Sequence, residues 1–252
     1  SSVPESLSDP LASHGRNTTG TLSVLEAARR NDARVVLASS AAVYGQPSSL
    51  PVSEDDSKDP TSPYGVDKLA ADHYTRVYAD RYDLPTVCLR YFNVYGPGQT
   101  SSAAGVVTTF IERATAGRPL VVHGDGSQTR DFVHVADVVD SLVHCLDGAT
   151  GRHLVTGPNL STKRVLGVLA DAVPGTCTVV PVPYRLVRWV VGPSMDLLHR
   201  AGVSPVPGAG FLERGDYGTV PADLTRRAPV PRRPWEAAIR DTVDWYARVG
   251  LL

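Results

Sequence analysis

The sequence predicts an α/β fold built around parallel strands. Two apolar runs carry this prediction, residues 34–40 and residues 86–90, and both have the continuous apolar character of strands buried on two faces. A long helix, at roughly 64–82, separates them, and this order indicates a right-handed parallel crossover. Ligands bind beyond the carboxyl ends of strands in open α/β sheets, so we expect functional residues where each run ends.

The other elements follow from apolar spacing and turn residues. Apolar side chains recur at helical spacing in residues 19–30, and residues 45–63 form a turn-rich stretch. After Gly96-Pro97-Gly98 the pattern changes to shorter elements. The elements expected there are a helix at 106–117, strands at 120–123 and 132–135 around a turn at 124–126, a helix at 136–146, two short helices in 184–200, and an amphipathic helix at 235–249.

Composition limits the classes of function. Hydrophobic residues make up 42% and charged residues 20% of the 252 residues, which suits a packed core. The net charge is −1 and the charges are interspersed, so neither nucleic acid nor a membrane surface is an expected partner. No apolar run approaches the roughly 20 residues of a membrane-spanning helix. The separated Cys88, Cys145 and Cys177 indicate reduced thiols of a cytoplasmic protein, and no Cys/His spacing indicates a metal.

Tyr64 and Lys68 form the first candidate for catalysis. Their i, i+4 spacing near the start of the long helix places both side chains on one face. A phenol has a pKa of about 10, and an adjacent ammonium favours the phenolate, which is the form that acts as a base. Such a pair is also common on ordinary helix surfaces, so its context decides between the two interpretations.

Two strand ends supply that context. Ser39 and Ser40 close the first apolar run, where a hydroxyl can hydrogen-bond a reacting oxygen and relay its proton toward a tyrosine. The alternative is a plain strand-to-loop turn, in which serine is common. Residues 90–97 (RYFNVYGP) close the second run, and their side chains suit either a planar cofactor with a phosphate or core packing.

A glycine-rich phosphate loop is not found in this chain. Dinucleotide-binding folds normally open with a strand, Gly-x-Gly-x-x-Gly and a helix. Gly96 with Gly98, and Gly124 with Gly126, follow the wrong elements and lack the third glycine. We therefore expect the first mononucleotide-binding half of such a fold, on the order of 75 residues, to be absent from this chain.

Four motifs, in order, resemble one enzyme family. They are SSAAVYG at 39–45, SPYGVDK at 62–68, RYFNVYGPG at 90–98 and GDGSQTRDFVHVADV at 124–138. With the C-terminal PADLTRRA, they resemble the extended short-chain dehydrogenase/reductases, and most closely the UDP-glucose 4-epimerases. The resemblance covers nearly the whole chain and thins between 174 and 212.

The resemblance implies a Rossmann-type parallel sheet, incomplete at the N-terminus, with a smaller C-terminal substrate lobe. Residues 1–98 and 132–150 are expected to form what remains of the NAD-binding domain. Residues 99–131 and 151–252 are expected to form the sugar-nucleotide lobe.

The resemblance also implies a role for each matching residue. Tyr64 is expected to be the catalytic base, Lys68 its partner on the cofactor ribose, and Ser40 the catalytic hydroxyl. Tyr91 and Phe92 are expected to line the nicotinamide. The expected cofactor is NAD, and the residues expected to bind it are Ser39, Tyr64, Lys68, Tyr91 and Phe92.

For the substrate, the resemblance places Asn93 and Arg130 at the diphosphate, where a guanidinium makes bidentate hydrogen bonds. A surface salt bridge is the alternative for Arg130. It places Val121 and His123 at the uracil, although His123 replaces a more usual aromatic residue. The residues expected to bind substrate are Ser40, Asn93, Val106, Val121, His123, Arg130, Arg214, Asp216 and Val220.

Three departures from the family pattern bear on the substrate and the reaction. Arg214-Gly215-Asp216 is one residue shorter than the family's Arg-x-Gly-Asp, so Asp216 aligns with the ribose contact better than Arg214 does with the phosphate contact. Val220 is small at the position beside the sugar, which favours N-acetylhexosamines as well. Ser40-Ala41-Ala42 lacks the acids that the 4,6-dehydratases carry there.

The resemblance implies NAD-dependent epimerisation at C4 of a UDP-hexose through a transient 4-keto sugar. The expected substrates are UDP-glucose, UDP-galactose or their N-acetyl forms. A cytoplasmic homodimer is expected, with an interface on the helices around Leu22 and Ala70. Two alternatives stay open: another sugar-nucleotide dehydratase or reductase, and a non-catalytic fragment that only binds a nucleotide sugar.

Overall fold

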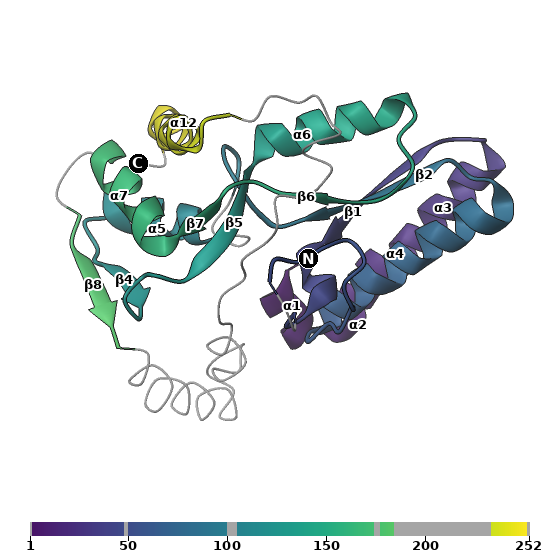
Figure 1. Cartoon of the computed structure of the whole chain (residues 1–252), viewed down its shortest axis with the longest axis horizontal. Coiled ribbons are helices and arrows are strands. Elements are labelled where there is room, and N and C mark those ends of the chain that lie inside the picture. The colour runs from purple at the N-terminus through teal and green to yellow at the C-terminus, as the bar shows by residue number, and fades with distance from the viewer. Residues whose placement is uncertain (1, 48–49, 100–104, 174–176, 184–232, 251–252) are drawn as a thin grey trace. The chain divides into compact units, whose positions relative to one another are not determined.

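The computed structural model describes residues 2–47, 50–99, 105–173, 177–183 and 233–250 (Figure 1). The fold is α/β with parallel strands, as predicted. The chain forms two compact units: unit 1 comprises Ser1–Phe92, Val138–Thr156 and Thr219–Val230, and unit 2 comprises Asn93–Asp137, Gly157–Gly218 and Pro231–Leu252. The predicted helices in 184–200 lie outside the described residues.

The centre of unit 1 is a parallel sheet in the order β1-β2-β6. Its strands are β1 (Val35–Ser40), β2 (Thr86–Tyr91) and β6 (Gly151–Val155). In the register, Ser40 pairs with Tyr91 and Tyr91 with Val155. The three strands therefore end level with one another, and their last residues form one carboxyl edge.

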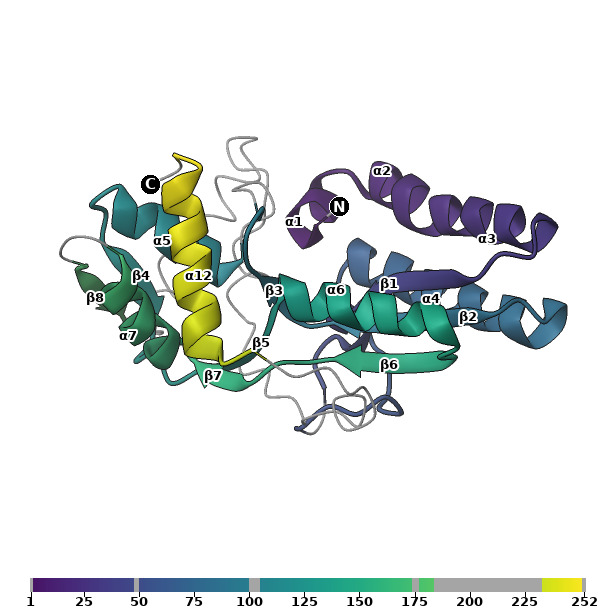
Figure 2. The same cartoon turned by 90° about the horizontal axis from the view of Figure 1, so that it is seen from above.

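Helices cover this sheet on both faces. α4 (Pro63–Tyr82) packs on β1 and β2, and α3 (Gly20–Arg30) packs against α4. Figures 1 and 2 show α6 (Val135–His144) on the opposite face. The shorter elements of unit 1 are α1 (Val3–Ser8), α2 (Pro10–His14), the π-helical turn η1 (Gly15–Thr19), and the 3-10 turns η2 (Ala41–Tyr44) and η4 (Cys145–Asp147).

The outer edge of β6 is protected by a side chain. The Glu54 carboxylate accepts a hydrogen bond of 3.2 Å from the backbone N–H of Leu154. Exposed strand edges otherwise invite pairing with other chains. One apolar core cluster of unit 1 lies among α3, α4 and β1 and includes Leu25, Val35, Tyr78 and Leu84.

Unit 2 has a mixed sheet and a helical layer. β3 (Asn93–Tyr95) pairs in parallel with β5 (Thr129–His134), and β5 pairs antiparallel with β7 (Asn159–Ser161). β4 (Leu120–His123) and β8 (Val179–Val182) form a separate parallel pair. The core joins these strands to α5 (Val106–Thr115), α7 (Thr162–Ala172) and α12 (Trp235–Arg248).

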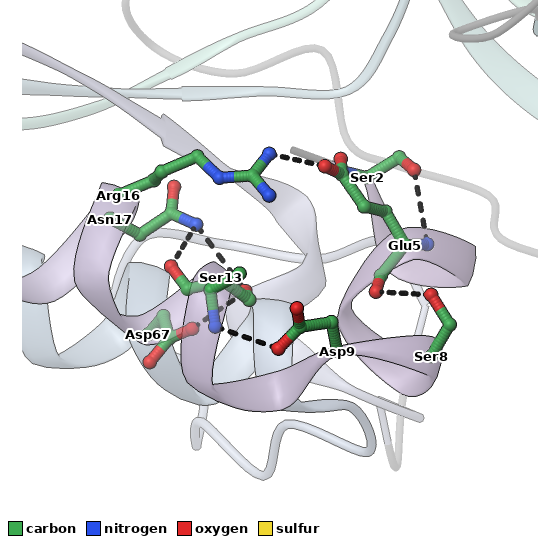
Figure 3. Close-up of polar contacts among 9 residues, drawn as sticks. Ser2, Glu5, Ser8, Asp9, Ser13, Arg16, Asn17 and Asp67 are labelled. Atoms are coloured by element: carbon green, nitrogen blue, oxygen red, sulfur yellow. Dashed lines mark hydrogen bonds and ion pairs between the residues drawn. The ribbon is translucent and has the colours of Figure 1, made fainter.

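The predicted strands and long helices are confirmed to within a few residues. The helix predicted at 136–146 begins at Val135 and ends at His144, where a 3-10 turn follows. The predicted helix at 19–30 is preceded by three elements that apolar periodicity did not reveal, namely α1, α2 and η1. Local capping starts two of them: the Ser2 hydroxyl accepts from Glu5 N–H, and the Asp9 carboxylate accepts from Ala12 N–H (Figure 3).

His134 links the stability of unit 2 to pH. Its Nδ1 accepts a hydrogen bond of 3.3 Å from Ala136 N–H, and burial lowers the pKa of this imidazole. The folded state therefore binds a proton less readily than the unfolded chain does. We expect the stability that neutral His134 contributes to be present above its ordinary pKa of about 6.5 and to be lost as the pH falls through the lowered value.

Urea unfolding measured from neutral to acidic pH checks this expectation. His134→Asn keeps a side chain that can accept from Ala136 N–H but does not titrate. The free energy of unfolding of this variant is expected to fall less steeply with acid than that of the wild type. Identical pH slopes for the two proteins would contradict the assignment.

Candidate active site

Tyr64 lies in the first turn of α4, and local sequence explains why the helix begins there. The Ser62 hydroxyl accepts a hydrogen bond of 3.1 Å from Gly65 N–H, and Pro63 takes the first helical position, where its missing N–H costs nothing. Tyr64 is half-buried. The turn therefore holds its phenol at a fixed place beside the sheet.

Ser40 meets Tyr64 from the end of β1. The Ser40 hydroxyl caps η2 by accepting a hydrogen bond of 3.1 Å from Ala42 N–H, and it lies close enough to the Tyr64 phenol to affect its pKa. Burial raises the pKa of Tyr64, and Ser40 opposes this rise. The structure thus brings the two predicted residues together, as a hydroxyl pair at the carboxyl edge of the sheet.

Lys68 lies one helical turn beyond Tyr64. Its Nζ donates a hydrogen bond of 2.9 Å to the Ala38 carbonyl and lies 5.7 Å from the centre of the Tyr64 ring. Burial lowers the pKa of Lys68, while Cys88 and Asp67 oppose that change. Ser40 is the group that opposes the effect of burial on the pKa of Tyr64, and the expected effect of Lys68 together with a bound nicotinamide stays a prediction.

Gly65 allows the close approach of α4 to the Ser40 turn. A Cβ at this position would lie 2.7 Å from the Ala42 carbonyl oxygen and 2.9 Å from the Pro60 Cβ. Both distances are shorter than side-chain contacts normally allow. The glycine is therefore required for the first turn of α4 to pack this closely on the turn that Ser40 begins.

Gly65→Ala is expected to destabilise the protein by about 1–3 kcal/mol, as overpacking does, and to separate Ser40 from Tyr64. Urea unfolding measures the loss. Gly167→Ala is the matched control, because Gly167 is also inside a helix and a Cβ added there would meet nothing within 4 Å. The control is expected to be neutral or stabilising by about 0.5–1 kcal/mol. Equal effects at the two positions would contradict this account.

The predicted cofactor-binding residues lie along the same edge. Ser39 is buried in β1 with its hydroxyl beside the Cys88 thiol. Tyr91 ends β2, and burial raises the pKa of its phenol. Phe92 packs partly against Val43, Tyr44 and Leu154, so it also contributes to the core, which was the alternative interpretation.

Three residues at this edge carry a buried hydroxyl that has no hydrogen-bond partner among the described residues. They are Ser39, Tyr91 and Thr156, and Thr156 directly follows β6. Buried polar groups in native proteins are normally satisfied, so such groups need an explanation. Sequence reasoning missed Thr156, although a hydroxyl residue directly after an apolar strand is the same signal that singled out Ser40.

Asp67, between Tyr64 and Lys68, anchors the preceding helices to α4. It is buried and accepts a hydrogen bond of 2.8 Å from the Ser13 hydroxyl (Figure 3). It also accepts a hydrogen bond of 3.1 Å from the Thr18 hydroxyl. The Nδ1 of His14 lies 2.9 Å from Oδ1 of Asp67, the oxygen that also accepts from Thr18. Sequence reasoning missed this residue too, because an acid before a lysine on a helix is typical of an ordinary surface position.

The predicted substrate-binding residues of unit 2 lie on several elements. Asn93 donates a hydrogen bond of 2.7 Å from its amide to the Asp131 carbonyl, which ties β3 to β5. Arg130 lies on β5 and donates to the Thr129 carbonyl at 2.8 Å. Val106 begins α5 and is exposed, Val121 is half-buried on β4, and His123 ends β4. Arg214, Asp216 and Val220 lie outside the described residues.

The described residues show neither a membrane span nor a metal cluster. Within them, no helix is long and apolar enough to cross a membrane. The same part of the chain contains no group of three or more His, Cys, Asp or Glu side chains arranged to hold a metal ion.

A hydroxyl pair and a lysine at the carboxyl edge of a parallel sheet fit an enzyme that moves a proton at an alcohol oxygen. A comparison with family models agrees with this class: the model of the NAD dependent epimerase/dehydratase family matches residues 1–157, more than half of the chain. The chain belongs to this family.

Among curated proteins, the chain is similar to UDP-glucose 4-epimerases. That of Mycolicibacterium smegmatis is 40% identical over 178 residues, covering 68% of this chain and 57% of the relative. That of Azospirillum brasilense is 36% identical over 206 residues, covering 69% of this chain and 59% of the relative. The chain thus spans only a little over half the length of these relatives.

Solved structures give the same picture. The UDP-glucose 4-epimerase of Thermus thermophilus in complex with NAD superimposes with a TM-score of 0.76 at 31% identity, covering 98% of this chain and 75% of that structure. The UDP-N-acetylglucosamine 4-epimerase of Methanobrevibacter ruminantium, in complex with UDP-N-acetylmuramic acid, gives a TM-score of 0.80 at 25% identity, covering 99% and 74%.

Proposed function

We propose that the protein to which this chain belongs is an NAD-dependent epimerase that inverts C4 of a UDP-hexose. The observation that carries the proposal is the position of Tyr64 and Lys68 beside Ser40 at the carboxyl edge of the sheet, with the Lys68 Nζ 5.7 Å from the centre of the Tyr64 ring. Family membership and the similarity to 4-epimerases support the reaction.

The residues at this edge fit NAD. The unpartnered hydroxyls of Tyr91 and Thr156 can bond the polar groups of a bound nicotinamide, and Lys68 can bond a ribose hydroxyl. We propose that Ser39, Tyr64, Lys68, Tyr91 and Phe92 hold it. When bound, NAD would accept a hydride from C4 of the sugar and return it to the opposite face.

The protein's own residues handle the proton. In the proposed mechanism the Tyr64 phenolate takes the proton of the 4-hydroxyl and returns it after the sugar has turned over. Ser40 hydrogen-bonds the same sugar oxygen and donates to Tyr64, which favours the phenolate. Lys68 adds positive charge near the ring. Because the hydride and the proton are both returned to the sugar, the reaction causes no net redox change.

The proposed substrate contacts lie in unit 2 and in the segment outside the described residues. We propose that Asn93 and Arg130 contact the diphosphate and that Val106, Val121 and His123 contact the uridine. Arg214 and Asp216 are proposed to contact phosphate and ribose. Val220 is proposed to leave room for an N-acetyl group beside the sugar, and turnover of UDP-glucose without turnover of UDP-N-acetylglucosamine would contradict that last assignment.

A homodimer in the cytoplasm is part of the proposal. Apolar side chains are exposed along α3 and α4, with Val24 at 57% and Val66 at 53%, and Tyr74 and Val77 lie on the same helix as Val66. Burying such a surface against a second copy would remove it from water. Cys88 and Cys145 are buried free thiols, which suits a reducing compartment. Sedimentation as a monomer at micromolar concentration would contradict the dimer.

Product identification tests the proposed reaction. The protein is incubated with NAD⁺ and UDP-galactose, and the products are identified by NMR. UDP-glucose is the expected product. A 4-keto-6-deoxy sugar would instead indicate a dehydratase, and a bound but unchanged substrate would indicate a binding protein.

A further inference from the structure

Arg90 is fully buried in β2 and has no part in the mechanism above. Its Nε donates a hydrogen bond of 2.8 Å to the Asp72 carboxylate, and its Nη2 lies 2.8 Å from the same oxygen. Its Nη1 donates to the Tyr44 hydroxyl and, at 2.9 Å, to the Glu54 carbonyl. One guanidinium therefore joins β2 to α4 through Asp72, to η2 through Tyr44, and to the following loop through Glu54.

The helix that Arg90 holds is the one that carries the proposed base. Asp72 is four residues after Lys68 and eight after Tyr64, so the three side chains lie along one stripe of α4. Asp72 is 2% exposed. Its ion pair with Arg90 fixes the distance of this face of α4 from β2 and the rotation of α4 about its own axis.

The turn that Arg90 holds is the one that Ser40 begins. Tyr44 is the last residue of η2, it is 2% exposed, and the Arg90 Cζ lies 5.2 Å from its ring centre. Burial raises the pKa of Tyr44 to about 12, so its hydroxyl stays neutral and accepts from Arg90. The turn is thus fixed at both ends, by the Ser40 cap at 3.1 Å and by Tyr44.

Stability alone does not account for this arrangement. A buried ion pair often adds no stability over apolar residues of the same volume, because both charges must be desolvated. What it adds is a fixed geometry, and a misplacement of about 1 Å at reacting groups costs on the order of a hundredfold in rate. Arg90 joins the two elements whose separation decides whether Ser40 reaches Tyr64.

We propose that Arg90 is a positioning residue that sets the distance between the Ser40 hydroxyl and the Tyr64 phenol, through Tyr44 on one side and Asp72 on the other. This inference rests on the proposed function, since it gives that contact a catalytic purpose. The effect of Arg90 on the approach of Ser40 to Tyr64 can be measured without turnover, through the titration of Tyr64.

Tyr44→Phe tests the inference, because it removes the hydroxyl that Arg90 holds and keeps the ring. We expect kcat to fall on the order of tenfold with an unchanged KM for the UDP-sugar. The titration of Tyr64, followed by NMR of Cζ-labelled tyrosine and assigned with Tyr64→Phe, is expected to move to higher pH. The reason is that Ser40 is the group that opposes the effect of burial on Tyr64, while Lys68 on the same helix face is left in place.

Tyr78→Phe is the matched control. Tyr78 is also on α4, is 6% exposed, and donates a hydrogen bond of 2.6 Å to Glu26 on α3. This variant is expected to lose stability as Tyr44→Phe does, with kcat and the Tyr64 titration unchanged. Equal losses of kcat in the two variants would overturn the inference, because they would reduce it to general destabilisation.

The two measurements separate the inference from the proposed function. The wild-type protein could lack epimerase activity while Tyr44→Phe still shifts the Tyr64 titration. That result would contradict the proposed function and support the positioning role of Arg90. An active wild type in which Tyr44→Phe leaves the titration and kcat unchanged would overturn the positioning role. Should Tyr44→Phe unfold, Arg90→Lys replaces it: a single ammonium can pair with Asp72 but cannot also hold Tyr44, and the same shift is expected.

Discussion

Replacing Tyr64 by phenylalanine is expected to lower kcat by about 10²- to 10⁴-fold, the usual contribution of a positioned general base. The change removes only the phenolic oxygen, so the ring stays in the first turn of α4. Ser40 remains in this variant but no longer has a phenolic oxygen beside it whose pKa it can lower. Turnover of UDP-galactose with NAD⁺ measures the effect.

Two controls accompany Tyr64→Phe. Tyr82→Phe removes a phenolic oxygen from the far end of the same helix, where the side chain is 52% exposed, and it is expected to keep wild-type activity. NAD affinity is expected to fall less in Tyr64→Phe than in Lys68→Met, since Lys68 remains in place. Retention of more than a tenth of the wild-type kcat would contradict the role given to Tyr64.

Lys68→Met is expected to weaken NAD binding by about 10- to 100-fold, which corresponds to the roughly 1.5–3 kcal/mol of a hydrogen bond to a charged group. We expect kcat to fall as well, because the positive charge near the Tyr64 ring is lost. Isothermal titration of the protein with NAD⁺ measures the first effect without turnover. Methionine keeps the apolar length of the side chain, so a collapse of the helix is not expected.

The control for Lys68→Met is Lys163→Met, at an exposed position on α7. It removes the same charge from the chain without touching the carboxyl edge of the unit 1 sheet, and NAD affinity is expected to be unchanged. Wild-type NAD affinity in Lys68→Met would contradict the assignment of Lys68 to the cofactor.

Much of unit 1 could be predicted because its strongest signals are local. β1 and β2 are continuous apolar runs, and α4 begins at a Ser-Pro pair, so pattern and propensity agree along each element. α1 and α2 escaped prediction because they are only 6 and 5 residues long, too short for an apolar stripe. Their capping residues, Ser2 and Asp9, were the available signal.

The candidate site was predictable only in part. Tyr64, Lys68 and Ser40 could be found from spacing and from strand ends. Thr156 reaches the same edge because β6 follows β2 in the sheet, which depends on pairing between segments far apart in the sequence. The ion pair of Arg90 with Asp72 could not be predicted, because the sequence of an apolar strand does not indicate which element supplies the partner of a charged residue within it. Tertiary contacts of this kind are invisible to a single sequence.

The central claim is that a sugar at the Ser40 and Tyr64 pair is oxidised and reduced again at C4. The most direct measurement uses UDP-galactose with deuterium at C4, incubated with the protein and NAD⁺, with the label followed by NMR and mass spectrometry. We expect UDP-glucose that carries the deuterium at C4, without exchange into water. A product that has lost the label, or a sugar that has lost water, would contradict the claim.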